Sequence, residues 1–484
     1  MNPTSPNETS ALIPNPTEGM IRSAAVEDYV SDEASVQESL NMHFDRIGAT
    51  TVRPGVTAYT AAALSAFATG YHQWTDTANN TRKLLAQDGT KLKVLSGGSW
   101  SDVHTFGSSN RIRSSQFLNF TFFCNGNGGD TPGYYNGTTF TSGIGSLPKC
   151  DYINSGFDFR LWGADKVTNK IYYTERYIVG SPITGGTDFL QITPELGQSI
   201  TALYQSQKAL LVFSQDNIFR IYGATSQDAY PAYYVGTYSQ ESICKAKDGL
   251  YFHHSSGFYK FQYDGQPQEI SRKVIDFVQA IPRSAYDNVF GWTDEDHVYW
   301  HVGNLTVEGI PYKNVVFRYT ISSQMWTIYS YFSKESSTKT LTAAFIYDDG
   351  SNLTRIVGVN DGTTAIINSG TTDLGDPIFY NNISRWMSMT KAQSRYQNLK
   401  SIAVTHINGA GAILEAQVDK DIEDKWTFIG DYDEKYVTLF QSVNTNLNAF
   451  NRVRFRTRGT STGTSPIFGT MEIINYEDLG AFYN

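Results

Sequence analysis

The chain has 484 residues, with 38 basic and 47 acidic side chains and a formal net charge of −9. That length suffices for two or three domains. Proteins that grip nucleic acid by its phosphates are normally basic, so the charge excludes an extended DNA-gripping surface and leaves passive contact or a local patch. Aromatic residues make up 14% of the chain and charged residues only 18%, and this balance is typical of many short strands joined by tight turns.

Several classes of protein are excluded early. No apolar run approaches the roughly 18 to 20 residues that a membrane helix needs, so we expect no membrane insertion. The N-terminus has neither the basic nor the apolar region of a secretory signal, so we do not expect one there. Cys124, Cys150 and Cys244 share no close spacing, which argues against a disulfide framework and against a thiolate zinc site. We therefore expect no metal and no cofactor.

Residues 1–45 form the first predicted segment, an extended N-terminal arm. Up to about residue 35 the arm is rich in Pro, Asn, Ser, Thr and Glu, and such a segment buries too little apolar surface to offset its ordering entropy. We expect it to order only against an adjoining subunit. Weak helical spacing at residues 26–30 and 36–40 allows one short helix.

Hairpin patterns recur along the second predicted segment, residues 46–380. The most regular is ALLVFSQDNIFRIYG, residues 209–223, in which two apolar runs flank a polar turn. The patterns centre near residues 88, 128, 166, 215, 256, 307 and 350, with a longer loop expected at residue 307. A hairpin that returns roughly every 40 to 50 residues is typical of a β-propeller, whose blades are four-stranded sheets. We predict a propeller of six or seven blades.

The pattern changes in the last predicted segment, residues 381–484. Six strands are expected there, with irregular spacing and no blade hairpin: residues 401–404, 412–418, 426–430, 437–442, 452–458 and 469–475. An antiparallel sandwich is the economical interpretation. The predicted fold class is therefore all-β, with a β-propeller followed by a smaller antiparallel β-sandwich.

Candidate catalytic groups do not form a constellation. His253 and His254 are adjacent on a predicted strand, so they point to opposite faces and do not easily ligate one metal. The acidic turn at residues 294–296 is more typical of solvated charge than of the facing carboxylates of a glycosidase. The acidic segment at residues 419–424 alternates as calcium loops do but lacks the Gly and the terminal Glu of an EF-hand. We expect no enzymatic activity.

The most informative polar feature is a row of four arginines, Arg452, Arg454, Arg456 and Arg458. A spacing of two on a strand projects all four from one sheet face. Four like charges in a row repel one another and need partners. Phosphate, carboxylates of an adjoining subunit and local acidic neighbours on a solvated face are the candidates. We assign the row to contacts between subunits.

Several stretches resemble the tail nozzle proteins of short-tailed phages, also called packaged-DNA stabilisation proteins. In the stretch ESLNMHFDRIGATTVRPGVTAY the matching residues are Asn41 and the turn Pro54-Gly55-Val56-Thr57. The segment ALLVFSQDNIFRIYGAT resembles the family's central blade, and VVFRYTISSQMWTIY resembles a later blade with Trp326 in the place of its tryptophan. The run of residues 451–456 resembles the closing strands of the family.

This resemblance implies a structural virion protein. A homo-oligomeric ring, of six copies by the resemblance, would extend the portal and adaptor channel, retain packaged DNA and conduct it at infection. The implied partners are the portal, the adaptor and other tail proteins, with passive contact to double-stranded DNA. The implied location is the phage tail, assembled in the host cytoplasm. The alternatives are a receptor- or glycan-binding phage tail propeller, with or without glycan cleavage, and a cellular propeller that acts as an interaction hub.

Overall fold

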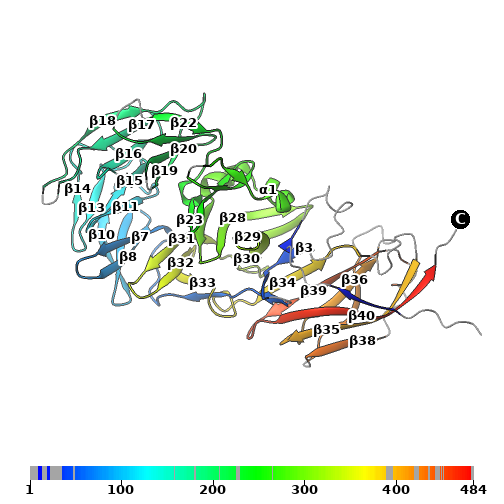
Figure 1. The fold of residues 1–484 in the computed structure, drawn as a ribbon. Coiled ribbons are helices and arrows are strands. Elements are labelled where there is room, and N and C mark those ends of the chain that lie inside the picture. Colours follow the sequence, from blue (N-terminus) through cyan, green and yellow to red (C-terminus); the bar gives the residue numbers. More distant parts are fainter. Residues whose placement is uncertain are drawn as a thin grey trace, which may run out of the picture.

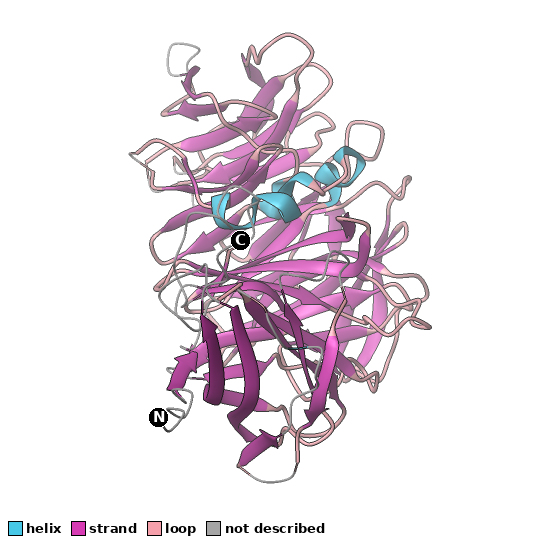
Figure 2. Ribbon diagram, turned by 90° about the vertical axis from the view of Figure 1, so that its right-hand side faces the viewer, coloured by secondary structure: helices cyan, strands magenta, loops and turns pink. Residues whose placement is uncertain are grey.

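The computed structural model describes residues 9–13, 19–21, 35–46, 49–156, 158–178, 181–206, 208–224, 229–263, 265–387, 396–418, 425–433, 436–441, 447, 450 and 452–480. Strands dominate both views of the molecule (Figures 1 and 2). The helical elements are α1 (Ile275–Gln279) and the 3-10 helices η2 (Gln240–Ser242), η3 (Arg272–Val274) and η4 (Arg283–Asn288). Within the described ranges, no helix has the length and apolar character needed to span a bilayer.

Seven four-stranded antiparallel units follow one another around a ring, which confirms the predicted propeller and sets its described blade count at seven. Blades 1 to 3 contain β7 (Ala68–Asp76), β8 (Thr81–Asp88), β9 (Lys91–Ser96) and β10 (Ser99–Thr105); β11 (Arg113–Phe117), β12 (Phe120–Cys124), β13 (Gly133–Tyr135) and β14 (Phe140–Ser142); and β15 (Tyr152–Ser155), β16 (Leu161–Asp165), β17 (Lys170–Thr174) and β18 (Gly185–Gln191). Blades 4 and 5 contain β19 (Ile200–Gln205), β20 (Leu210–Ser214), β21 (Ile218–Ile221) and β22 (Ala229–Tyr233); and β23 (Cys244–Ala246), β24 (Gly249–His254), β25 (Gly257–Phe261) and β26 (Gln268–Glu269). Blades 6 and 7 contain β27 (Phe290–Thr293), β28 (His297–Val307), β29 (Ile310–Thr320) and β30 (Met325–Ser330); and β31 (Leu341–Asp348), β32 (Leu353–Val359), β33 (Thr364–Ile367) and β6 (Val56–Ala58).

Each of the seven predicted hairpin turns falls in a different blade. The turn at residues 215–217 joins β20 to β21, as its polar residues predict. The expectation of a longer loop near residue 307 is wrong, because β28 ends at Val307 and β29 begins at Ile310. There β28 and β29 continue to a tight turn at Glu308 and Gly309, whose φ angles are 49° and 82°. A two-residue type I′ hairpin turn requires positive φ at both of its central residues.

Aromatic side chains fill the space between blades 5 and 6. The ring centroids of Phe258 and Trp300 lie 4.5 Å apart, and those of Trp300 and Trp326 lie 6.1 Å apart. Trp326 also donates from Nε1 to the carbonyl of Ile270 at 2.9 Å, so its polar atom is satisfied while its ring is fully buried. The high aromatic content therefore serves packing between blades in this part of the ring.

The ring closes with a strand from early in the chain. β6 pairs antiparallel with β33 as the outermost strand of blade 7, with Thr57 opposite Ile366. The innermost strand of blade 7, β31, lies beside β7 of blade 1 and β27 of blade 6. The first propeller strand in the sequence thus completes the last blade.

The β-sandwich is also confirmed, and all six strands expected in residues 381–484 are present. One sheet has the order β38-β35-β40-β5-β4, with β1 added on β40; its strands are β38 (Val437–Gln441), β35 (Tyr396–Ile407), β40 (Ile467–Gly480), β5 (Ala49–Val52), β4 (Met42–Arg46) and β1 (Thr9–Ile13). The facing layer contains β34 (Ile378–Ser384), β39 (Val453–Ser461), β36 (Ile413–Val418) and β37 (Thr427–Asp431). Their inner faces bury one apolar core, which includes Tyr380, Ile402, Leu414, Phe455 and Phe468.

A single ten-stranded sheet runs from the propeller into the sandwich (Figure 1). β3 (Ser35–Leu40) lies between β30 of blade 6, beside which it runs parallel, and β34 of the sandwich, with which it pairs antiparallel. β2 (Gly19–Met20) adds to β3. The two domains are therefore joined by backbone pairing as well as by side-chain contacts.

The described parts of the N-terminal segment pair within the same chain, which differs from the expectation that the segment orders only against an adjoining subunit. β1 pairs with β40, β2 with β3, and β4 with β5. The short helix allowed at residues 36–40 is wrong, because these residues form β3, and residues 26–30 lie outside the described residues. In β3 both faces are covered, so Val36 and Leu40 are buried together with Glu38 and Ser39, and the alternation expected of a half-exposed strand is lost.

Candidate functional site

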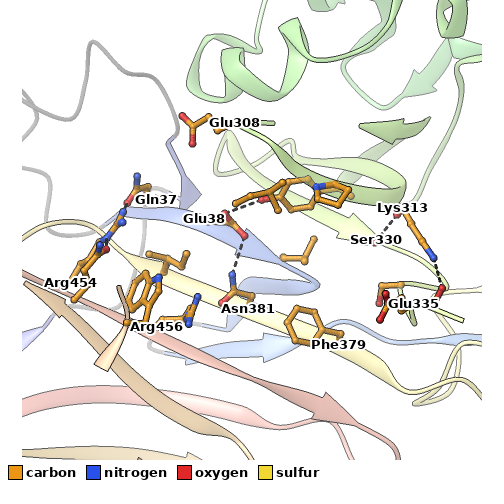
Figure 3. Close-up of a pocket in the computed structure, with 18 residues that line it drawn as sticks. Gln37, Glu38, Glu308, Lys313, Ser330, Glu335, Phe379, Asn381, Arg454 and Arg456 are labelled. Atoms are coloured by element: carbon orange, nitrogen blue, oxygen red, sulfur yellow. Dashed lines mark hydrogen bonds between the residues drawn. The ribbon is translucent and has the colours of Figure 1, made fainter. Parts of the chain in front are cut away.

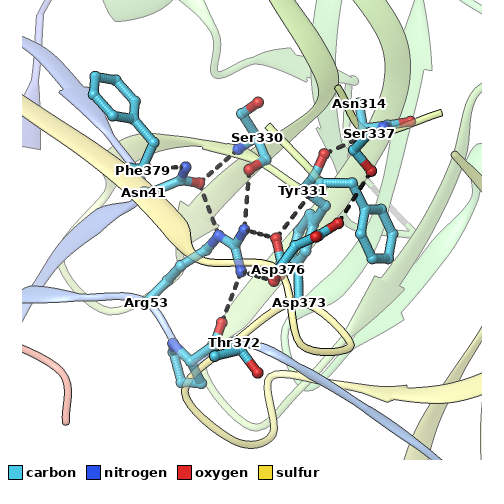
Figure 4. Close-up of polar contacts among 12 residues, drawn as sticks. Asn41, Arg53, Asn314, Ser330, Tyr331, Ser337, Thr372, Asp373, Asp376 and Phe379 are labelled. Carbon is cyan, nitrogen blue, oxygen red and sulfur yellow. Dashed lines mark hydrogen bonds and ion pairs between the residues drawn. The ribbon is translucent and has the colours of Figure 1, made fainter. Parts of the chain in front are cut away.

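Three of the residues that carry the resemblance, Asn41, Pro54 and Gly55, meet at a buried junction where the propeller, β3 and the sandwich come together (Figure 4). Asn41 directly follows β3, with a positive φ of 58°, which Asn tolerates better than most residues. Its Nδ2 donates to the carbonyl of Phe379 in β34 (2.6 Å), and its Oδ1 accepts from the backbone N of Ser330 in β30 (2.7 Å). One amide side chain thus ties blade 6 to the sandwich.

Arg53 occupies the centre of this junction. Its Nη1 and Nη2 donate to the two carboxylate oxygens of Asp373 at 2.8 and 2.7 Å, and its Nε donates to Asn41 at 2.7 Å. The side chains of Arg53 and Asp373 are both 0% exposed, and the guanidinium stacks on Tyr331 at 3.9 Å. Burial alone would lower the pKa of Arg53, but the Asp373 carboxylate outweighs it and holds that pKa above its usual value.

The Pro-Gly turn beside Arg53 fits the junction closely. The carbonyl of Pro54 accepts from Arg53 Nη1 at 2.9 Å, and Gly55 exchanges backbone hydrogen bonds with Gly370 and Ser369. A Cβ on Gly55 would lie 2.0 Å from the carbonyl oxygen of Thr372, so only glycine fits here. The structure therefore brings Asn41, Pro54 and Gly55 together at one joint, with Thr57 in the strand that leaves it.

The arginine row lies on β39, on the sandwich face opposite the core. Arg454, Arg456 and Arg458 alternate with the buried residues Val453, Phe455 and Thr457, which confirms that the three strand arginines share a face. Arg452 directly precedes the strand.

This row already has partners inside the chain. Nε of Arg456 and Nε of Arg458 donate to the same Glu415 oxygen at 2.6 and 2.8 Å. Arg454 donates to Gln417 at 2.7 Å and also hydrogen-bonds Gln37 of β3. Burial alone would raise the pKa of Glu415, but the hydrogen bonds from Arg458 and Arg456 outweigh it and leave that pKa below its usual value.

Two tryptophans interleave with the arginines to form a ladder. Arg454 stacks between Trp386 (4.7 Å) and Trp426 (5.2 Å), and Arg456 lies over Trp426 at 4.3 Å. Guanidinium groups held over indole faces gain cation–π attraction and keep a defined orientation. We call Trp386, Trp426 and the four arginines the Arg–Trp ladder. Sequence spacing located the arginines, but the tryptophans come from other segments and could not be assigned to them.

Three members of the ladder, Trp426, Arg454 and Arg456, line a cleft of about 830 Å³ between the sandwich and blade 6 (Figure 3). At the centre of the cleft, Glu38 of β3 accepts from Asn381 Nδ2 (3.0 Å) and from the Tyr312 hydroxyl (3.2 Å). Lys313 lines the far end, where its Nζ donates to the carbonyl of Glu335 at 2.7 Å. The lining of the cleft thus carries three cations, Lys313, Arg454 and Arg456, and three carboxylates, Glu38, Glu308 and Glu335.

The acidic turn at residues 294–296 organises a hairpin. Asp294 accepts from His297 Nδ1 (2.7 Å), from the Tyr299 hydroxyl (2.8 Å) and from backbone N–H groups of the turn. Burial alone would raise the pKa of Asp294, but the bond from His297 outweighs it and brings that pKa to about 2. Asp294 is therefore a charged structural acceptor in this turn.

The remaining candidates do not converge either. His253 is buried between Phe258 and Tyr286, and burial lowers its pKa to about 3, whereas His254 contacts Asp216 at 2.9 Å. Residues 419–424 lie outside the described residues. Across the described ranges there is no group of three or more His, Cys, Asp or Glu side chains placed to hold a metal ion.

We expected no Gly-x-Ser-x-Gly elbow in the sequence, but the pattern itself occurs at residues 459–463. In a nucleophile elbow the serine sits on a sharp turn between a strand and a helix, with its hydroxyl exposed. Ser461 is instead the last residue of β39, is buried, and donates to the carbonyl of Thr464 at 3.2 Å. The pattern therefore has no catalytic geometry here.

Comparisons with known proteins give no family. No family model matches the sequence, and no curated protein does. Among solved structures, a catalytically inactive virginiamycin B lyase from Staphylococcus aureus with quinupristin is 12% identical, with a TM-score of 0.43, over 64% of this chain and 97% of that one. The extracellular domain of a protein named as a hybrid two component system from B. thetaiotaomicron is 10% identical, with a TM-score of 0.47, over 86% of this chain and 59% of that one. YCF48 from Cyanidioschyzon merolae is 12% identical, with a TM-score of 0.41, over 64% of this chain and 98% of that one.

Proposed function

We propose that the protein is a structural subunit of a phage tail nozzle and has no catalytic role. The observation that carries the proposal is the buried junction. Asn41, Pro54 and Gly55 carry the resemblance to nozzle proteins, and with Arg53 they fasten β3, the propeller closure and the sandwich to one another. Residues of a family signature that serve architecture support an architectural function.

The joined domains suit a conduit under load. A nozzle subunit below a packed capsid has to keep its two domains in fixed relation while DNA is retained and then released. In this chain a continuous sheet crosses the domain boundary, and a fully buried ion pair lies beside it. The net charge of −9 also suits passage of DNA, because a channel lining without strong basic patches would give DNA few phosphate contacts to hold.

The proposed assembly is a homo-oligomeric ring of six copies in the virion tail, in contact with the portal, the adaptor and other tail proteins and in passive contact with packaged double-stranded DNA. We assign the Arg–Trp ladder to ring contacts. The exposed part of a row of oriented guanidinium groups suits carboxylates of a neighbouring copy, since charge-assisted pairs with carboxylates are directional.

Assembly of purified full-length protein tests this proposal. Negative-stain electron microscopy is expected to show rings for the wild type, alone or with portal and adaptor proteins. The double variant Arg454→Gln/Arg456→Gln should form fewer rings, with its circular dichroism unchanged, and high salt should weaken wild-type rings because it screens the pairs. Arg272→Gln/Arg283→Gln removes the same charge from exposed propeller positions and should assemble normally. A wild type that stays monomeric with its partner proteins would overturn the nozzle assignment.

The interdomain cleft favours one second candidate, a glycan-binding tail propeller. Its volume of about 830 Å³ lies within the range of ligand pockets, and its polar groups include Glu38, Asn381 and Arg456. A glycan array followed by Glu38→Gln and Asn381→Ala variants separates the two functions. Specific glycan binding that these variants abolish would support the second candidate, and hydrolysis of the bound glycan would also contradict the absence of catalysis.

A further inference from the structure

The axis of the propeller holds a second cavity, separate from the interdomain cleft. Its volume is about 500 Å³, and its walls come from inner strands of six blades: β7, β11, β19, β23, β27 and β31. Phe290 and Trp292 are among the lining residues, but their side chains are largely buried, at 4% and 2% exposed. The space lies within the roughly 300 to 1,000 Å³ typical of small-molecule sites.

This axial cavity is positive inside an acidic protein. Its charged lining residues are three cations, Arg111, Arg113 and Lys245, and one carboxylate, Glu241, so its net charge is +2. His72 also lines the cavity, but burial lowers its pKa to about 3 and leaves it neutral at pH 7. A positive, partly enclosed space in a chain of net charge −9 concentrates anions.

One of the two arginines, Arg113, donates from all three guanidinium nitrogens to acceptors within the chain. Arg113 donates from Nε and Nη2 to the two oxygens of Glu241 at 2.9 and 3.4 Å, and its Nη1 donates to the carbonyl of Asp151 at 3.2 Å. Its guanidinium also stacks on Tyr152 at 4.4 Å. Burial alone would raise the pKa of Glu241, but Arg113 and then Arg111 outweigh it and bring that pKa to about 2, so the carboxylate stays charged.

Arg111 is left with surplus charge. It reaches the same carboxylate through one contact, Nη1 to Oε2 at 3.2 Å, while that oxygen also accepts from Arg113 and from the Ser239 hydroxyl at 3.1 Å. Its side chain is only 21% exposed. Two arginines therefore share one negative charge in a partly desolvated space, where an uncompensated cation is costly and a second anion is favourable.

We propose that the axial cavity binds a small organic anion through a phosphate or carboxylate group, with Arg111 as the principal ligand and Lys245 as a second cation. The group pairs with the guanidinium donors of Arg111 that Glu241 does not take. Arg113 is a positioning residue, because its contacts to Glu241 hold that carboxylate in place beside Arg111. The site does not depend on ring assembly, so the proposed ligand binding and the proposed nozzle function can be tested independently.

Isothermal titration calorimetry on the full chain tests the site, with inorganic phosphate, citrate and adenosine monophosphate as separate titrants at pH 7 and low salt. We expect at least one titrant to bind with a Kd below about 1 mM, which corresponds to roughly −4 kcal/mol. Preference for phosphate and the nucleotide identifies a phosphate ligand, and preference for citrate identifies a carboxylate ligand. If none of the three titrants binds even at a concentration 10-fold above that expected Kd, the proposal is overturned.

Variants then locate the binding. Arg111→Gln should weaken it at least 10-fold, and Lys245→Gln, at an exposed position that cannot disturb the core, should weaken it about 2- to 5-fold. Arg272→Gln removes the same charge from η3, outside the lining of the cavity, and should leave binding unchanged. If Arg111→Gln fails to fold, the Lys245→Gln result decides. Wild-type affinity in both cavity variants, or equal weakening by Arg272→Gln, overturns the assignment to this cavity.

Discussion

Arg53 at the junction and Arg456 on the ladder both pair with a carboxylate, but they differ in burial. Arg53 and Asp373 are completely enclosed and share two short bonds, whereas the side chain of Arg456 is 20% exposed and shares Glu415 with Arg458, which is 39% exposed. A buried charge that loses its partner has no water to replace it, whereas an exposed one is rehydrated. Loss of the carboxylate should therefore cost more stability at the junction than on the ladder.

This difference suits the two roles proposed for the molecule. The junction has two fixed backbone acceptors for Arg53, the carbonyls of Pro54 and Ser330, so a change in domain arrangement would break several bonds at once. The ladder holds its arginines by stacking, by the shared carboxylate of Glu415 and, for Arg454, by Gln417 and Gln37, and stacking does not occupy their donors. Four substitutions test this contrast, from the largest expected effect to the smallest.

The largest effect is expected from Asp373→Asn. It leaves the buried Arg53 charge without its partner and should lower the free energy of unfolding by about 3 to 5 kcal/mol. Denaturant unfolding followed by fluorescence measures the change. Asp361→Asn alters an exposed turn aspartate in the same way and should change stability by less than about 0.5 kcal/mol. A loss below about 1 kcal/mol in Asp373→Asn would show that the junction does not depend on the pair.

The next effect concerns the turn beside that pair. Gly55→Ala places a Cβ 2.0 Å from the Thr372 carbonyl oxygen, so backbone has to move, at a cost of about 1 to 3 kcal/mol. Gly463→Ala has open space around its Cβ and serves as the control. Equal melting temperatures for the two variants would contradict the close fit of the turn.

A smaller and pH-dependent effect is expected on the ladder. Glu415→Gln should lower stability at pH 7 by about 1 to 2 kcal/mol, because two arginines lose a charged acceptor. The pKa of Glu415 is below its usual value of 4.5 in the folded protein, so its contribution is complete above that value and is lost as the pH falls further. Unfolding of both proteins at pH 7 and at pH 3 is the measurement. A difference that persists unchanged at pH 3 would contradict an ionic role.

The smallest effect is expected from an exposed pair on the propeller. Lys247 contacts Asp296 at 3.2 Å, with its side chain 62% exposed. Lys247→Gln should change stability by about 0 to 1 kcal/mol, and added salt should remove the difference. A larger or salt-independent loss would show that exposure does not separate the two classes of ion pair as the comparison requires.

Local features of the fold could be predicted from the sequence because local chemistry sets them. The polar turn at residues 215–217 and the Asp-Gly turn at residue 88 each specify a hairpin, and both form. The tight turn after residue 307 was missed because the segment before it, Gly303 to Thr306, is polar and glycine-containing like a loop, although it continues β28 with bulges.

The junction could be predicted only in part. The Pro-Gly turn and Asn41 are visible in the sequence, but Asp373 lies 320 residues from Arg53 and carries no local sign of its role. The same holds for Glu415 and the two tryptophans of the ladder, whose position beside the arginines depends on strand pairing across the sandwich. The helix allowed at residues 36–40 was wrong for a related reason. Both faces of β3 are buried, so its sequence lacks the periodicity that separates a strand from a helix.

The closure of blade 7 by β6 has a consequence for synthesis on the ribosome. β6 is made early, yet its partner β33 follows roughly 300 residues later, which at about 5 to 20 residues per second is about 15 to 60 seconds. β5 remains without its partner for longer still, because that partner, β40, is the last described strand in the chain. Throughout this interval the growing chain carries unpaired strand edges, which are prone to wrong pairing. Slowing of translation near residue 370, or a chaperone that shields the early strands, should therefore change the yield of folded protein more than the same intervention at the middle blades.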